Sequence, residues 1–475
     1  AGSGGSHIAV TVIGGRWGAQ YRQTQPAATL SGWTLVNQTC AGILYCGINS
    51  LSVLSLVDTV LEAGNASTAV WTASNQLYMR RVYAKGFDTV AFMNRTNRNV
   101  TPEGSPGLWT VVDEVVYGVP SPPHYDEGQK WTLGAPSYVD GHRSETTTVR
   151  VGPGSPPADT VSQYQWGPAF PTFDMQGVVN VKDAPYHAAG DGMTDDRAAL
   201  QAALDGAPQG SAVVLPRGQY AVGGTLVVPA GRQVVGVAHH MVSFFVYPHT
   251  PAVTTVDWQA EGPRSVYRQG AQWINSDVCS MQPTLSWCPP SGTFEAPLFT
   301  VTGEGRGLFY VMHFENDSPQ SATYRHLRVS ATGAGPRRFL HLNAEHAESG
   351  GNFEVSDADN VDIFGMKSEG LHLVGLFSNV RNVSMYGYGG NACPSATGGD
   401  FGDLPASVFR VTGTASGLSL VCLVQYVGAG GLSTALQGIP CPAPDTWISV
   451  FSSSTSLPAN VSTAPLDRPV LFRIN

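Results

Sequence analysis

The chain has 475 residues, of which 42% are hydrophobic and only 13% are charged. Its length predicts two domains or one elongated repeat architecture, and its low charge argues against disorder, coiled coils and helical bundles. The formal net charge of -9, without a Lys/Arg cluster, argues against nucleic acid as a partner, and no apolar run approaches the roughly 18 residues of a membrane span.

Short apolar runs separated by Gly and Asn fill residues 1–118. Examples are Ile8–Ile13, Trp33–Val36 and Leu51–Leu54. The runs recur at roughly 20 to 26 residues, which is typical of one coil in a stacked β-solenoid. The 55 Gly and 33 Pro residues favour many short strands joined by turns, so we expect an all-β chain.

Residues 119–172 have a different composition, with Pro-rich segments at Pro120–Pro123 and Gly152–Pro157. Such punctuation predicts a long connector. We therefore expect a first β-helical region at 1–118, the connector at 119–172 and a second β-helical domain at 173–475.

The second domain opens with a helix signal near residues 195–205. Asp195 and Asp196 precede the helix, where free amides and the positive helix end favour carboxylates. Leu200 and Leu204 then mark one apolar face. Because strand-like runs follow at once, we expect a short helix that caps the start of a second stack of strands.

A repeat later in the chain predicts the architecture. The segment Asn360–Gly365 is echoed by Asn382–Gly387 at a spacing of 22 residues. One coil of a parallel β-helix needs about that length, and stacking places like residues over like. We therefore expect Asn382 over Asn360 in a turn, and Ile363 and Met385 above one another inside.

Cysteines and sequons indicate the compartment. The seven cysteines match no paired zinc-binding spacing, and we expect no metal site and no cofactor. Cys279 and Cys288 flank one loop, and Cys393 and Cys441 are a second candidate disulfide pair. The Asn-x-Ser/Thr sequons exceed the roughly three expected by chance and favour secretion in a eukaryote, although polar turns are an alternative explanation. These sequons lie at Asn37, Asn65, Asn94, Asn99, Asn316, Asn382 and Asn460.

The opening of the second domain resembles the pectate-lyase-like superfamily of right-handed parallel β-helices, which includes rhamnogalacturonase-like and polygalacturonase-like hydrolases and tandem exo-1,3-glucanases. The resemblance rests on Gly190–Asp196, the helix after it and Val214–Tyr220. It covers residues from about 175 onward and is specific for the fold. It is weak for the reaction, because hydrolases, lyases, epimerases and adhesins share this fold.

The first region resembles the late coils of another such helix, but no Gly-Asp-Gly opening precedes it. We therefore expect two tandem β-helical regions, the first of which begins in mid-solenoid. Because exposed strand edges invite association, its open end would be covered by upstream sequence, by self-association or a partner chain, or by the second helix.

Glycoside cleavage needs a proton donor and a second carboxylate, roughly 5 to 9.5 Å apart. The richest acidic segment supplies our candidate catalytic residues, Glu345, Glu348, Asp357 and Asp359. The two aspartates are better explained as turn residues. The ordered motifs of polygalacturonases are missing, and a lyase using Asp357 and Asp359 with Lys367 or Arg381 fits only loosely.

Aromatic and polar residues that alternate along the second domain form a candidate polysaccharide-binding surface, because indole and phenol rings stack on sugars while guanidinium groups bind hydroxyls. An alternative is that these rings only pack loops onto the solenoid. The candidates are Trp258, Arg268, Trp273, Trp287, Tyr310, His313 and His341.

These features lead to a secreted carbohydrate-active protein, with glycoside hydrolysis of a β-glucan or another cell-wall polysaccharide as the first hypothesis. A polysaccharide lyase is a further alternative. The rival of another class is a non-catalytic extracellular glycoprotein that builds a coat, filament or adhesin from the same solenoid.

Overall fold

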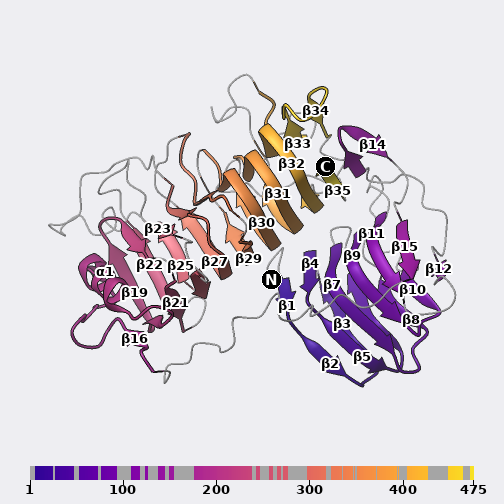
Figure 1. The fold of residues 1–475 in the computed structure, drawn as a ribbon, viewed down its shortest axis with the longest axis horizontal. Coiled ribbons are helices and arrows are strands. Elements are labelled where there is room, and N and C mark those ends of the chain that lie inside the picture. The colour runs from indigo at the N-terminus through magenta and orange to yellow at the C-terminus, as the bar shows by residue number, and fades with distance from the viewer. Residues whose placement is uncertain are drawn as a thin grey trace.

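The chain forms two stacks of parallel β-coils that lie side by side (Figure 1). The computed structural model describes residues 6–24, 27–47, 53–72, 76–93, 109–117, 124–126, 137–144, 149–153, 176–229, 231–237, 242–246, 256–259, 265–268, 271–275, 297–316, 322–333, 335–345, 347, 350–370, 372–392, 394, 404–425, 448–463 and 471–475. Within these residues almost every ladder is parallel, which confirms the predicted all-β parallel β-helix in two tandem regions.

The first stack consists of two parallel sheets. The larger sheet contains β1 (Ser6–Ile8), β4 (Ala27–Ser31), β7 (Val53–Ala63), β9 (Gln76–Lys85), β11 (Trp109–Tyr117) and β15 (Val149–Pro153), with β2 (Thr11–Ile13) and β5 (Thr34–Gln38) alongside. The smaller sheet contains β3 (Trp17–Thr24), β6 (Ala41–Gly47), β8 (Thr68–Thr72), β10 (Thr89–Met93) and β12 (His124–Asp126).

The second stack has three faces, and its long strands bend around corners to contribute to more than one. The first face begins with β16 (Val179–Asn180), β18 (Ala212–Leu215), β21 (Gln233–Gly236) and β24 (Ser265–Arg268). The second face begins with β17 (Asp191–Asp195), β19 (Gly218–Val222), β22 (Val242–Val246) and β25 (Ala271–Asn275). Both continue through β27 (Gly307–Asn316), β29 (Arg337–Ala344), β30 (Phe353–Gly370), β31 (Gly375–Ala392) and β32 (Ser407–Gln425).

The third face contains β20 (Leu226–Val228), β23 (Val256–Gln259), β26 (Phe299–Thr302), β28 (Leu327–Ser330), the first parts of β30, β31 and β32, and β33 (Ile448–Ser452). The last strands pair antiparallel with the stack: β34 (Val461–Ser462) with β33, and β35 (Leu471–Ile474) with β32.

The segment predicted as a connector, 119–172, also contains strands of both stacks. β12 and β15 extend the two sheets of the first stack. β13 (Ser137–Val139) forms a hairpin with β14 (His142–Ser144) and pairs with β35 of the second stack. This segment therefore joins the coils laterally as well as linking them in sequence.

The 22-residue repeat stacks as predicted. Ile363 of β30 pairs with Met385 of β31, and both side chains are fully buried. In the turn, the Asn382 amide donates to Oδ1 of Asn360 at 2.6 Å. The interior continues through aromatic pairs such as Phe309 and Phe339, whose ring centroids lie 4.5 Å apart.

The predicted helix is α1 (Arg197–Gly206), which buries Leu200 and Leu204 against the core. It lies at the β16 end of the second stack (Figure 1). Asp196 does not cap the helix through its side chain. Its buried carboxylate instead accepts hydrogen bonds from the amides of Ala189 and Gly190, at 2.6 and 2.9 Å, and so fixes the loop before the helix.

The two stacks contact one another through the first face. Tyr386 of β31 packs on Tyr78 of β9, with ring centroids 6.3 Å apart, and on Phe364. Thr29 of β4 donates to the Tyr386 carbonyl oxygen at 2.9 Å, and Arg80 contacts the Tyr386 hydroxyl. This apolar seam with polar contacts joins two solenoids that are far apart in sequence.

Candidate functional site

Three polar side chains lie in register on the second face of the second stack. His313 of β27 pairs with Asn343 of β29, and Asn343 pairs with Lys367 of β30. Alternate residues of a strand point to opposite sides of the sheet. The sequence neighbours Met312, Phe314 and Met366 are buried in the core, so the three polar side chains point away from it. The fold therefore gathers on one face residues that are up to 54 positions apart in sequence.

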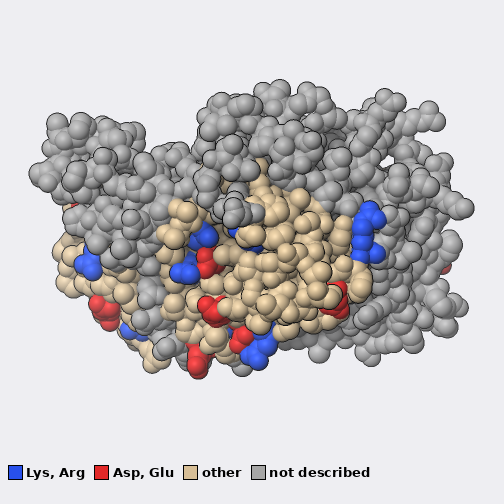
Figure 2. Space-filling model, turned by 90° about the horizontal axis from the view of Figure 1, so that it is seen from above, with Lys and Arg blue, Asp and Glu red and all other residues tan. Residues whose placement is uncertain are grey.

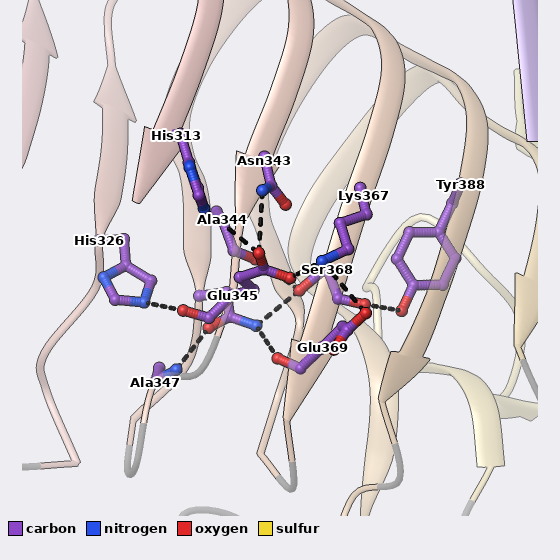
Figure 3. A network of polar contacts seen from close by, with 11 residues as sticks. His313, His326, Asn343, Ala344, Glu345, Ala347, Lys367, Ser368, Glu369 and Tyr388 are labelled. Carbon is purple, nitrogen blue, oxygen red and sulfur yellow. Dashed lines mark hydrogen bonds and ion pairs between the residues drawn. The ribbon is translucent and has the colours of Figure 1, made fainter. Parts of the chain in front are cut away.

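Glu345 is the centre of the network that these residues form (Figure 3). It follows the end of β29 and is 3% exposed. One carboxylate oxygen, Oε1, lies 3.2 Å from Nε2 of His313 and accepts from the Asn343 amide at 2.9 Å. The other, Oε2, contacts the ammonium of Lys367. Both oxygens of a buried carboxylate are thus engaged.

This surrounding keeps Glu345 ionised. Burial alone would raise the pKa of its carboxyl group, but hydrogen bonds from His313 and Asn343 and the charge of Lys367 outweigh burial and lower the pKa to about 2. Glu345 is therefore a carboxylate at any ordinary working pH, and it is suited to hold a charge or a base role, not to donate a proton.

Lys367 joins two carboxylates. Its ammonium also contacts Oε1 of Glu369 at 3.1 Å. Burial favours the neutral amine, but the charges of Glu345 and Glu369 and their hydrogen bonds outweigh burial and raise the pKa of Lys367. Lys367 is therefore protonated, and a protonated lysine cannot act as the base of a lyase.

Inside the coil, buried polar groups hold the Glu345 segment in place. His326 donates from Nε2 to the Glu345 carbonyl oxygen at 2.8 Å, while its Nδ1 contacts the Tyr324 hydroxyl at 2.8 Å. Asn352 accepts from the Ala347 amide at 2.9 Å and donates to the Ser368 hydroxyl at 2.6 Å. These contacts tie the turn after β29 to the next coil and fix the geometry of the network.

Two of the predicted sugar-binding residues lie at the corner between the first and second faces. His341 has a positive φ of 66°, and its pKa is lowered by burial and then by the neighbouring His7 and His313. Tyr310 is half-buried and packs against the apolar cluster between the stacks. His341 therefore lies near enough to both His7 of β1 and His313 for their charges to act on it.

Asp357 and Asp359 lie at a different corner, between the third and first faces. Asp357 is exposed, has a φ of 51°, and accepts from the Asn379 amide at 2.9 Å. Asp359 accepts two hydrogen bonds from Arg381, the shorter at 2.7 Å. The structure therefore brings Glu345 together with Glu369. Asp357 and Asp359 instead form hydrogen bonds within the turns.

The register of the described strands places two of the predicted tryptophans. Trp273 of β25 pairs with Phe314, and Trp258 of β23 pairs with Val301, two residues that are fully buried. Arg268 lies in β24, in register with Tyr310. Glu348 and Trp287 lie outside the described residues.

Most of the cysteines and several sequons also fall outside the described part of the chain. The two predicted disulfides, between Cys279 and Cys288 and between Cys393 and Cys441, lie outside it, as do Asn94 and Asn99. Asn316 ends β27. The exposed sequon asparagines are Asn37, Asn65, Asn382 and Asn460.

Sequence reasoning missed Asn343 and gave Lys367 and Glu369 no central place. A signal for them exists, because Asn343 and Glu345 are followed 24 residues later by Lys367 and Glu369. That spacing is about one coil, and the two-residue step within each pair is that of neighbours on one strand face.

The dependence of the free energy of unfolding on pH is expected to reveal the ionisation of Glu345. Its pKa in the folded state lies well below the ordinary value of 4.5, so its contribution is fully present above about pH 4.5 and is lost as the pH falls toward 2. We expect about 3 kcal/mol of acid-dependent stability from this group. Urea unfolding at a series of pH values measures it, and Glu345→Gln is expected to flatten this part of the profile; an unchanged slope would contradict the assignment.

Among the described residues, no group of three or more His, Cys, Asp or Glu side chains is arranged to bind a metal ion. The helix that the structure describes is too short to cross a membrane.

Comparison with known proteins supports the fold. The family described as rhamnogalacturonase A/epimerase, pectate lyase-like, matches residues 178–247, which contain β16 to β22 and α1. No curated protein matches the chain in sequence. The family match and the β-solenoid are those of carbohydrate-active proteins. Together the match over residues 178–247 and the β-solenoid support a likeness to the pectate-lyase-like superfamily of parallel β-helix proteins.

Proposed function

We propose that the protein is a secreted glycoside hydrolase that binds a β-glucan or another cell-wall polysaccharide along the second face and cleaves it at the Glu345 network. The observation that carries the proposal is the meeting of Glu345 and Glu369 at Lys367, beside His313 and Asn343. Two carboxylates that contact the same ammonium nitrogen lie close together, and retaining glycosidases need a close pair of carboxyl groups.

The two carboxylates would have different roles. Glu345, with its pKa of about 2, would be the permanent anion that stabilises or attacks the positively charged transition state. Glu369, whose side chain is 17% exposed, would be the proton donor at the rim after it has lost the contact with Lys367 and taken up a proton. For this chemistry Lys367 must swing away from the space between them when a sugar enters.

The test is a screen for new reducing ends on a panel of polysaccharides, read beside ultraviolet absorbance for unsaturated lyase products. We expect reducing ends without that absorbance. Glu345→Gln and Glu369→Gln are expected to lower kcat by about 10² to 10⁴. Asp357→Asn, at the other corner, is the matched carboxylate control. Equal losses in all three variants, or unsaturated products, would contradict the assignment.

A second candidate function is a non-catalytic extracellular coat, filament or adhesin. The observation that favours it is the saturation of Glu345 by His313, Asn343 and Lys367, which is typical of a structural network. Absence of both kinds of product, with filaments under the electron microscope, would support this function over hydrolysis.

Secretion through a eukaryotic pathway predicts a particular pattern of glycosylation. We expect glycans on the exposed residues Asn37, Asn65 and Asn460. Asn382 is expected to be less occupied, because its amide already donates to Asn360 in the turn ladder. Peptide mass spectrometry after enzymatic deglycosylation in heavy-oxygen water measures each site. Full occupancy of Asn382, or unmodified asparagine at the other three, would contradict this pattern.

A further inference from the structure

One position on the second face forms a ladder of hydrogen-bonding residues across successive coils. The strand pairings give it the register His313, Asn343 and Lys367 in three successive coils. Neighbouring strands are about 4.8 Å apart, so a sugar chain parallel to the stack axis would meet one ladder residue per coil. With His counted as neutral, only the last of these residue types carries a charge.

That charge is already neutralised. Lys367 contacts the carboxylates of both Glu345 and Glu369, so these three side chains together carry a net negative charge. A uronic-acid residue placed beside them would meet two carboxylates and an ammonium that is already paired. The electrostatics at this end of the ladder therefore oppose an acidic polymer.

Asn343 indicates what the ligand offers instead. Its amide nitrogen donates to Glu345, and because a carboxylate can only accept, this contact fixes the orientation of the amide. Its carbonyl oxygen Oδ1 is then a buried acceptor with no hydrogen-bond partner among the residues that the structure describes. A buried acceptor of this kind calls for a donor, and a sugar hydroxyl would be one if the movement of Lys367 that admits the sugar also exposes this oxygen.

We propose that the second face selects a neutral, hydroxyl-rich polysaccharide, of the glucan type, and rejects polymers of uronic acids. The inference rests on the proposed function and names the substrate class of the same site. On the described part of the surface that Figure 2 shows, basic side chains are interspersed with acidic ones.

Calorimetric titration of the full chain with two sets of oligosaccharides of equal length tests the proposal. The neutral probes are β-1,3-linked and β-1,4-linked glucose hexamers, and the acidic probe is a galacturonic acid hexamer. Measurement at low temperature keeps turnover slow. We expect a neutral hexamer to bind at least about tenfold more tightly than the acidic one.

Two variants test whether the charge beside the ladder causes this selectivity. Glu369→Gln removes one negative charge and is expected to raise the affinity for the acidic hexamer relative to the neutral one by several fold. Asp205→Asn removes the same charge from an exposed position on α1 and is expected to leave the ratio unchanged.

The outcomes separate the two levels of inference. Preferred binding of the galacturonic acid hexamer would overturn the substrate class and leave a polysaccharide site in place. Binding of neither type would overturn the proposed function as well. Selectivity that responds equally to Glu369→Gln and Asp205→Asn would also overturn the proposal, because the charge that matters would then not be at the ladder.

Discussion

Replacing Tyr386 with Ala is expected to lower the free energy of unfolding by about 3 to 5 kcal/mol. Tyr386 is 1% exposed and packs on Tyr78 and Phe364, while Thr29 donates to its carbonyl oxygen. Because its ring fills the seam between the stacks, its loss leaves a cavity that neither rigid solenoid can close.

Tyr386→Phe is the matched control, because it keeps the ring and removes only the hydroxyl that contacts Arg80. We expect it to cost about 1 to 2 kcal/mol. Circular dichroism and tryptophan fluorescence during urea unfolding measure both variants. If the Ala variant unfolds like the wild type, Tyr386 does not join the stacks; if its two probes separate, the stacks have lost their coupling.

The second large effect is expected at Lys367. Lys367→Met removes the cation and leaves the 3% exposed carboxylate of Glu345 without its charged partner. Breaking a buried ion pair from one side costs about 3 to 5 kcal/mol. We expect a loss near 3 kcal/mol, since His313 and Asn343 still donate to Glu345.

The double variant Lys367→Met, Glu345→Gln separates charge from shape. It removes both charges, and we expect it to recover a large part of the stability that the single variant loses. Lys85→Met, at an exposed position on β9, controls for the loss of a surface lysine. Additive effects of the two substitutions, without recovery, would show that Lys367 and Glu345 are not coupled.

The sequence predicts the architecture well because a solenoid repeats locally. The spacing between Asn360 and Asn382 is one coil, and the Ile363–Met385 pairing follows from it. The strands within 119–172 were missed because Pro and Gly dominate there, and β15 is recognised as a strand only by its pairing with β11.

The site is harder to predict because coils differ in length and turn at corners. Asp357 and Asp359 are close to Glu345 in sequence, yet the chain passes a corner before them, and they bind Asn379 and Arg381 instead. Trp273 is of a residue type that often binds sugars. Its register with Phe314, however, depends on the lengths of the coils, which cannot be read from the sequence.

The proposed function requires the second face to be the carbohydrate site. A crystal structure of the Glu369→Gln variant with a neutral glucose hexamer tests this directly. We expect the sugar to lie along the ladder, with a hydroxyl donating to Oδ1 of Asn343 and the chain crossing the coils of His313 and Lys367. A hexamer bound on the third face, or between the stacks near Tyr386, would contradict the account.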